Sequence, residues 1–177
     1  VTEKKIVLKY DTDSAGQAIK NVTALYTHHG PVMANRNGQV LSLRADNRLM
    51  DGLIQCWQRT KAAGLADFKK TLDLQGNISN NTVYADDAGN IAYWHGNRIP
   101  KRDNKFDWSI AVDGTTKETE WNGLHPINEI VQSINPANGW LQNCNSTPYT
   151  VAGKNSPLKQ NYPEYMAPDG ENFRGIN

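Results

Sequence analysis

Two short hydrophobic runs on either side of a polar turn form the clearest pattern in the sequence. Thr82–Ala85 and Ile91–His95 are rich in the β-branched and aromatic residues that suit a pleated strand. The residues between them favour a tight reversal of the backbone: Asp86, Asp87, Gly89 and Asn90. The pattern predicts a β-hairpin, and apolar side chains on both faces of its second run predict a central strand covered on two sides.

The first 45 residues alternate between strand-like runs and turns. Four hydrophobic segments are separated by turn residues: Lys4–Tyr10, Ala18–Tyr26, Val32–Met33 and Val40–Leu43. Short strands bounded by Gly, Asn and Pro are typical of antiparallel sheets. We therefore expect a strand-and-turn meander in this section.

The period of the pattern changes after residue 45. Apolar residues recur at helical spacing over Leu49–Trp57, and a second, shorter helix is expected over Asp67–Leu74. The first helix has residues suited to its ends, namely Asp46 or Asn47 at the start and Gly64 at the finish. Because a large aromatic residue on an apolar stripe normally packs in a core, we expect Trp57 to be buried.

The remainder of the chain has little periodicity. Phe106–Val112 is compatible with one extended segment, and Trp140–Asn143 with a short strand. From Gly153 onward the sequence is rich in Pro, Gly, Asn and Tyr and predicts no regular element. Long ordered loops usually serve a function or rest on other structure. We therefore expect a domain that needs further chain segments to cover it.

Composition narrows the class of protein. The 177 residues include 19 basic and 18 acidic side chains, which give a net charge of +1, and 38% are hydrophobic. This balance gives no electrostatic reason to expect nucleic acid or an anionic membrane as partner. The sequence has no apolar run as long as a membrane span and no signal-peptide pattern. The length suits one domain or a piece of a larger one.

The cysteines and histidines give weak signals for metal binding. Cys56 and Cys144 have no second Cys or His at ligand spacing, so we expect two free thiols. Adjacent side chains of an extended strand point to opposite faces, so His28 and His29 are interpreted as a polar strand end. His95 faces inward on the predicted central strand and is interpreted as a core histidine with a hydrogen-bond partner. The Asp86–Asn90 residues suit calcium, but a hairpin turn uses the same residues.

A second notable stretch, Gly139–Pro148, gathers polar side chains at the end of a predicted short strand. Asn143 and Asn145 would project to the same side of an extended chain. Side-chain amides are neutral donors that can stabilise a developing oxyanion. The same residue types also close turns, and from composition alone a turn is the favoured interpretation.

Five motifs together are similar to those of one known family. They are THHGPVM (Thr27–Met33), YADDAGNIAYWHGNRIPKR (Tyr84–Arg102), WNGLHP (Trp121–Pro126), INPANGW (Ile134–Trp140) and LQNCNSTP (Leu141–Pro148). Their order and separation resemble the β chain of the penicillin acylase family, whose members are N-terminal nucleophile amide hydrolases. The resemblance covers almost the whole chain, and five motifs in the right order make it specific.

This resemblance implies an α+β fold, part of the αββα sandwich of N-terminal nucleophile hydrolases, with a helical pair near residues 46–75. It also implies hydrolysis of a side-chain amide through an acyl-enzyme on a serine at the start of the β chain. In the family, a backbone N–H and an asparagine side chain hold the oxyanion. The N-x-N segment matches Asn143–Asn145, so the resemblance assigns this role to Asn145, with Asn143 as the second candidate.

The match begins well inside the β chain, which implies a nucleophile outside this sequence. Val1 is not a nucleophile, and we expect residues 1–177 to be one partial domain, without an internal boundary and inactive alone. Arg174 is the candidate for an arginine that members use after the N-x-N segment. In the calcium site of several members, Trp108 would supply a carbonyl ligand, while the place of an aspartate ligand falls near Ser156. We therefore expect no cofactor in this chain, and calcium only in the full-length protein.

The implied partners are a small acyl amide and the remaining α and β segments of the same precursor, and the implied location is the periplasm or the cell exterior. Two alternatives stay open. One is a stand-alone β-rich module that binds, for example, carbohydrate through exposed tryptophans: Trp94, Trp108, Trp121 and Trp140. The other is a metal hydrolase that uses His28, His29 and the Asp86–Asp87 pair.

Overall fold

A computed structural model of the chain describes residues 1–12, 16–45, 49–77 and 80–167. These residues fall into two compact units, Val1–Asp46 and Asn47–Asn177, which are described separately. Each unit contains an antiparallel sheet, and two α-helices lie in the second unit. The predicted α+β class is therefore confirmed. That residues 1–177 form one partial domain without an internal boundary stays a prediction.

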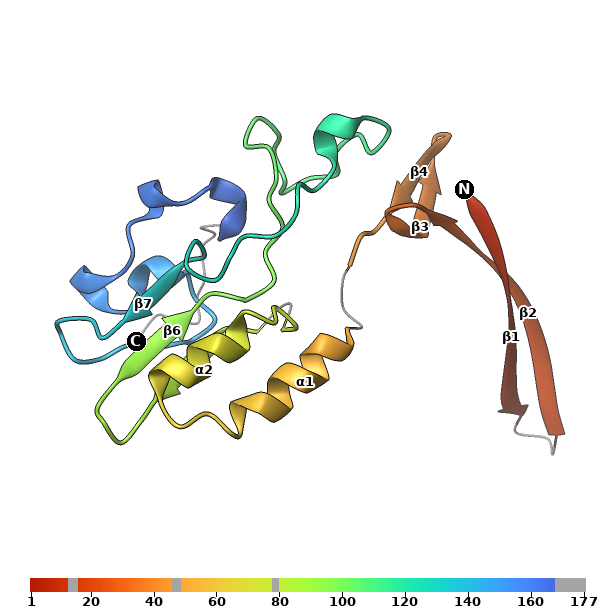
Figure 1. Ribbon diagram of the computed structural model, residues 1–177. Helices are drawn as coiled ribbons and strands as arrows, with labels where there is room; N and C mark the ends of the chain where they lie inside the picture. The colour runs from red at the N-terminus through yellow and green to blue at the C-terminus, as the bar shows by residue number, and fades with distance from the viewer. Residues whose placement is uncertain (13–15, 46–48, 78–79, 168–177) are drawn as a thin grey trace. The chain divides into compact units, whose positions relative to one another are not determined.

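The first unit is a four-stranded sheet in the order β1-β2-β3-β4 (Figure 1). Its strands are β1 (Thr2–Thr12), β2 (Gly16–Thr27), β3 (Gly30–Arg36) and β4 (Gln39–Ser42). The long hairpin of β1 and β2 pairs from Thr2 opposite Tyr26 to Thr12 opposite Gly16. The predicted meander is confirmed, and most of its strands are longer than the sequence pattern indicates.

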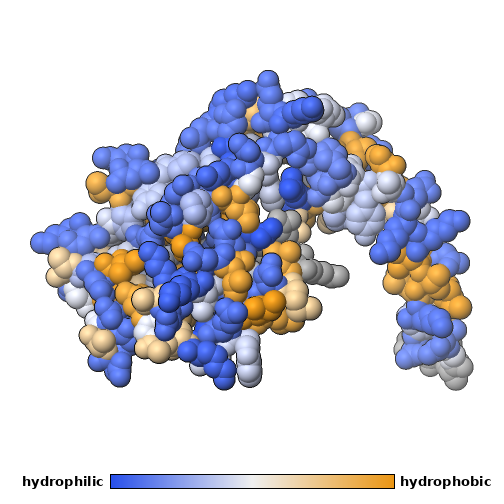
Figure 2. Space-filling view, viewed as in Figure 1, coloured by the Kyte–Doolittle hydropathy of each residue, from blue (hydrophilic) through white to orange (hydrophobic). Residues whose placement is uncertain are grey.

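The β1–β2 hairpin carries apolar side chains on both of its faces. Figure 2 shows hydrophobic residues between hydrophilic ones along this hairpin. Val7 and Leu8 are 58% and 48% exposed, and as neighbours in a strand they point to opposite faces. None of the residues described in this unit is buried. This sheet therefore has no core of its own among the described residues.

The second unit is organised around the predicted hairpin. Strands β5 (Thr82–Ala85), β6 (Ile91–Trp94) and β7 (Gln132–Ile134) form a sheet in the order β5-β6-β7 (Figure 1). Strand β6 is central, as predicted. Strand β7 is not predicted, because three residues are too few to show an alternating pattern.

Both faces of β6 are covered, which also confirms the prediction. Ala92 and Trp94 are fully buried on one face, against residues of helix α2 (Leu65–Leu72) such as Leu72. Tyr93 is buried on the other face, in a smaller cluster with Val151 and Ala152. The second unit therefore has a central strand that is covered on both faces, and neighbouring loops can be anchored to it.

Helix α1 (Met50–Arg59) differs from the prediction in the face that it buries. Trp57 was expected in the core, but its side chain is 67% exposed, and Leu53 on the same stripe is 68% exposed. The buried residue of this helix is Gln55, whose Oε1 accepts the backbone N–H groups of Gly76 and Asn77. The prediction for Trp57 is wrong because periodicity identifies the apolar face of a helix but not whether another segment covers it.

The predicted helix boundaries are only partly correct. Helix α1 ends at Arg59 with Thr60 as C-cap, and Gly64 is instead the N-cap of α2. The expected capping residues Asp46 and Asn47 lie outside the described residues.

The loops of the second unit contain turns in place of two predicted extended segments. No strand forms over residues 106–112 or 140–143. In the first of these, the Asp107 carboxylate accepts both the backbone N–H and the hydroxyl of Ser109, which favours a turn. Five short 3-10 helices lie in the described loops: η1 (Lys117–Thr119), η2 (Pro148–Thr150), η3 (Gly153–Asn155), η4 (Lys159–Asn161) and η5 (Glu164–Met166).

Candidate functional site

The segment that contains the two candidate asparagines is anchored before and after them. Before them, the Gln142 N–H donates to the Val151 carbonyl at 2.8 Å, and Leu141 packs against the cluster of Tyr93 on the sheet. After them, Thr147 caps helix η2 and Pro148 is buried. The middle of the segment, residues 143–145, is exposed. The loop therefore presents three exposed residues from a fixed base.

Asn143 is held in one orientation by two hydrogen bonds to its side-chain oxygen. Its Oδ1 accepts the side-chain amide of Asn81 at 3.2 Å and the backbone N–H of Asn145 at 3.3 Å. Its Nδ2 makes no hydrogen bond to another residue in the described part of the chain. The oxygen of this amide is thus occupied, whereas its NH₂ group has no partner among the described residues.

Asn145 lies at the turn of the loop, with a left-handed φ of 55°. Asparagine tolerates this conformation better than most residues because its short polar side chain forms local hydrogen bonds. The extended chain that would project Asn143 and Asn145 to one side does not form, and the turn that the composition favours is present. The structure instead makes a turn in which the side chain of Asn143 supports the backbone of Asn145.

Asn81 is a residue of this site that sequence reasoning missed. It lies directly before β5, and its Oδ1 accepts the backbone N–H of Gly96 at 3.1 Å, just beyond β6. Its Nδ2 is the donor to Asn143, 62 positions away. The one available signal was its position in an Asn-Asn pair at the start of the hairpin, which gives no indication of a partner so distant in sequence.

A hydrogen-bonded pair of a buried tyrosine and a half-buried histidine lies on β6 and at its end, next to Gly96. The Tyr93 hydroxyl and His95 Nδ1 are 3.0 Å apart. Burial lowers the pKa of His95 and raises the pKa of Tyr93, so both side chains favour their neutral forms. The hydrogen-bond partner expected for His95 is confirmed, but the side chain is half-buried and does not belong to the core. These two side chains therefore add no charge to the sheet next to Gly96.

The other predicted site residues lie apart from this loop or outside the description. Arg174 lies outside the described residues. Trp108 donates its Nε1–H to the Asp103 carbonyl at 2.8 Å, and its ring lies beside the guanidinium of Arg102. Ser156, near the expected place of a calcium-binding aspartate, uses its hydroxyl oxygen to accept the Ala152 N–H at 2.9 Å.

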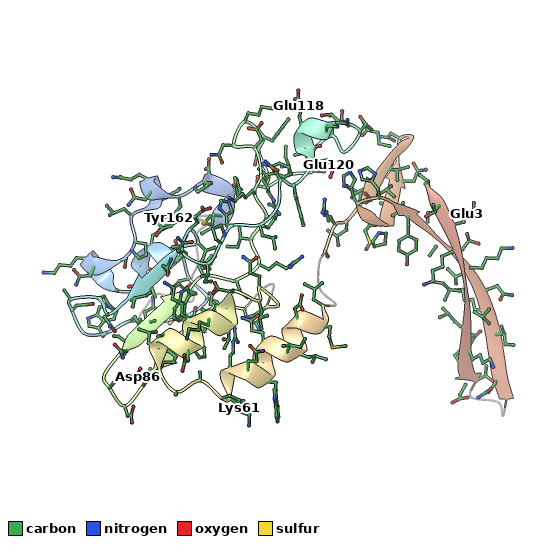
Figure 3. All side chains as sticks on the ribbon, in the orientation of Figure 1. Glu3, Lys61, Asp86, Glu118, Glu120 and Tyr162 are labelled. Atoms are coloured by element: carbon green, nitrogen blue, oxygen red, sulfur yellow. The ribbon has the colours of Figure 1, made fainter. Side chains whose placement is uncertain are left out.

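The Asp86–Asn90 residues form the hairpin turn, as the structural interpretation predicts. Asp86 accepts the backbone N–H of Asn90 at 2.8 Å and the Tyr84 hydroxyl at 2.9 Å. These bonds occupy the carboxylate and lower its pKa, with the Asn90 side-chain amide as the largest cause. Figure 3 labels Asp86 at this turn. The calcium alternative at these residues stays untested.

His28 and His29 form a two-residue turn between β2 and β3, in the first unit. Their ring centroids are 3.7 Å apart. The expectation that they point to opposite faces of a strand is therefore wrong, because the chain reverses at these residues. The Asp86–Asp87 pair of the metal-hydrolase alternative belongs to the second unit.

The tryptophans do not form the exposed stacking surface that the carbohydrate-binding alternative requires. Trp94 is fully buried. Trp108 and Trp121 are partly buried and both lie beside the Arg102 guanidinium, at 5.1 and 5.3 Å. Trp140 is 49% exposed.

Both cysteines are free, as predicted.

Comparison with known proteins gives concordant results. The profile of the penicillin amidase family matches residues 2–175 of the chain. The chain is 28% identical over 158 residues to penicillin acylase 2 proenzyme of Pseudomonas sp. (strain SE83), and the aligned region covers 87% of this chain and 19% of that protein. It is 28% identical over 137 residues to penicillin G acylase of Escherichia coli, and the aligned region covers 75% of this chain and 16% of that protein.

A solved structure shows the same relationship. Thermostable penicillin G acylase from Alcaligenes faecalis matches with a TM-score of 0.71 and 26% identity, over 89% of this chain and 29% of that one. The chain thus spans less than a fifth of the length of either curated relative. Because the family profile extends over nearly all of the sequence, the chain belongs to the penicillin amidase family, also called the penicillin acylase family.

Proposed function

We propose that this chain is part of an amidase that cleaves a linear side-chain amide through an acyl-enzyme, and that Asn145 is a donor to the oxyanion. The observation that carries the proposal is the exposed turn at Asn143–Asn145, which is anchored to a covered sheet. Family membership supports amide hydrolysis, because the relatives are named penicillin acylases.

An exposed asparagine suits the chemistry of amide cleavage. When a serine oxygen attacks the amide carbonyl carbon, negative charge develops on the carbonyl oxygen. A side-chain N–H can bind that oxygen without giving up a proton, and a donor fixed in advance is most effective. Asn145 is exposed at the turn, and Asn143 is the second candidate because its Nδ2 makes no bond to the described residues.

We place the nucleophile, an N-terminal serine, in a segment outside this chain. The relatives support this placement, since the chain spans 19% and 16% of their lengths and one of them is named a proenzyme. The serine oxygen would bond to the acyl carbon, the amine would leave with a proton, and water would then release the acid. In this scheme the chain supplies transition-state stabilisation and part of the surrounding wall.

The remaining assignments rest on the family. The proposed partners are a small acyl amide and the other α and β segments of the precursor, and the proposed location is the periplasm or the cell exterior. Within the described residues, no helix has the length and apolar character needed to span a bilayer. We propose no calcium site from this chain alone, because Ser156 is a neutral hydroxyl already bonded to Ala152 and does not replace a carboxylate.

Replacement of Asn145 by Ala in the full-length enzyme tests the oxyanion assignment. We expect kcat on chromogenic acyl-anilides to fall by about 10²–10³ with little change in KM, because the bond forms only in the transition state. Asn135→Ala is the matched control, since Asn135 is also exposed and has a left-handed φ of 47°.

The outcomes separate the two candidate donors. If Asn143→Ala lowers kcat and Asn145→Ala does not, the donor is Asn143. If neither lowers kcat beyond the control, the proposal is wrong. Turnover by the 177-residue chain alone would place the nucleophile inside it.

A further inference from the structure

We infer that Asn81 is a positioning residue for the oxyanion donor. This inference rests on the proposed function, in which Asn145 provides that donor. Asn81 is distant from the N-x-N segment in sequence but bonds directly to it, through Asn143. It is half-buried, whereas Asn143 and Asn145 are exposed.

Three hydrogen bonds connect the central strand to the turn. The Gly96 N–H, just beyond β6, donates to Asn81 Oδ1 at 3.1 Å. Asn81 Nδ2 donates to Asn143 Oδ1 at 3.2 Å. That same oxygen accepts the Asn145 N–H at 3.3 Å. The backbone of Asn145 is thus linked, through two side-chain amides, to the end of a strand that is covered on both faces.

The chain of bonds has a direction, because Asn81 accepts a hydrogen bond through its oxygen and donates one through its nitrogen. Asn81 must accept on one side and donate on the other, as an asparagine does. Because Asn81 Nδ2 is a donor, it favours the orientation of the Asn143 amide in which Oδ1 points toward Asn81. The Asn145 N–H needs the same oxygen as its acceptor. If Asn143 turned over, its NH₂ would meet the Asn145 N–H, and two donors would oppose each other. Asn81 therefore fixes the turn that presents the Asn145 side chain.

Asn81→Asp in the full-length enzyme removes this selection with almost no change of shape. A carboxylate still accepts the Gly96 N–H but cannot donate to Asn143, so we expect the Asn143 amide to turn over and Asn145 to shift. A donor displaced from its position binds the transition state less well. We expect kcat to fall roughly tenfold with unchanged KM, because ground-state binding does not use this donor.

Asn135 offers a closely matched control at the opposite end of the same hairpin. Its Oδ1 accepts the Ile91 N–H at 2.9 Å, and its Nδ2 donates to Asn90 Oδ1 at 2.9 Å. Asn135→Asp therefore makes the same chemical change in the same bonding pattern, away from the turn. We expect it to leave kcat within about twofold of the parent enzyme. An equal loss in both variants would overturn the inference, because it would indicate a general effect of the charge.

A double variant separates this inference from the proposed function. If Asn81 acts through Asn145, Asn81→Asp should cause no further loss of kcat in the Asn145→Ala enzyme. A full tenfold loss in that background would overturn the positioning role while leaving the oxyanion assignment intact. If Asn145→Ala alone keeps full kcat, the assignment of Asn145 as oxyanion donor is wrong, whatever the effect of Asn81→Asp. Asn81→Ser, which lacks the reach to Asn143 and adds no charge, should reproduce the loss if Asn81→Asp does not fold.

Discussion

The side-chain oxygen of Gln55 accepts the backbone N–H of Gly76 at 2.8 Å, across 21 positions of the chain. The same oxygen accepts the Asn77 N–H at 3.0 Å. Gln55 is fully buried, although Leu53 and Trp57 in the same helix are exposed. A polar side chain, rather than the apolar stripe, therefore joins helix α1 to the segment that follows α2.

Gln55→Leu should destabilise the second unit. The substitution keeps the size of the side chain but leaves the Gly76 N–H without its acceptor, which costs about 1–3 kcal/mol for a buried group. The Asn77 N–H keeps only its longer bond to Asn97 Oδ1, at 3.4 Å. The free energy of unfolding in urea, followed by circular dichroism, measures the loss. Gln58→Leu is the control, because Gln58 is exposed on the same helix. Equal stability of the two variants would contradict the structural role of Gln55.

Gly76→Ala should also be destabilising, for a steric reason. An added Cβ would clash with the carbonyl group of Asp51 and with the Gly52 nitrogen, all of which are backbone atoms. Because backbone cannot move as a flexible side chain does, helix α1 must shift, at a cost of about 1–3 kcal/mol. Gly16→Ala is the control, since its added Cβ meets nothing within 4 Å. Urea midpoints that fall equally in both variants would show that the close approach is absent.

Local signals allowed the central hairpin to be predicted, whereas coverage by distant segments was not predictable. The turn residues and the two-sided apolar pattern of β6 are properties of adjacent residues, so they are visible in the sequence. The exposure of Trp57 depends on which segment, if any, lies over helix α1. The burial of Gln55 likewise depends on two N–H groups more than 20 positions away. Periodicity contains neither kind of information.

The candidate site shows the same division. The residues alone favoured a turn at Asn143–Asn145, and the structure contains one. The oxyanion role came from the family resemblance, which aligns a motif whose chemistry is not evident from composition. Asn81 was missed by both routes, because its bond to Asn143 exists only after the hairpin and the loop have come together. A sequence pattern does not reveal hydrogen bonds between the side chains of distant segments.

The stability of the second unit should fall as the pH decreases through the range in which histidine titrates. Burial lowers the pKa of His95, so the folded protein holds it neutral while the unfolded chain gains a proton below its ordinary pKa of about 6.5. The unfolded state then binds more protons, and the stability present above pH 6.5 is lost as the pH falls toward the folded pKa. Urea midpoints measured between pH 7.5 and pH 5 should show this decline (about 25 °C, constant salt).

His95→Gln should make that decline shallower. Glutamine can still bond to the Tyr93 hydroxyl, which is 3.0 Å from His95 Nδ1, but it does not titrate. The comparison of slopes isolates His95 from the other histidines, which are the same in both proteins. Identical slopes in the two proteins would show that protonation of His95 is not linked to unfolding.

Tryptophan fluorescence should distinguish the exposed helix stripe from the core of the sheet. Trp57 is 67% exposed and Trp94 is fully buried, so acrylamide should quench the first and spare the second in the 177-residue chain. Trp57→Phe should therefore lower the quenchable fraction, and Trp94→Phe should raise it. A quenchable fraction unchanged by Trp57→Phe would show that another part of the protein covers helix α1. In the longer enzyme of the proposed function, the same pair of variants would measure coverage directly, because Trp57 must become protected if a further segment packs on the apolar stripe.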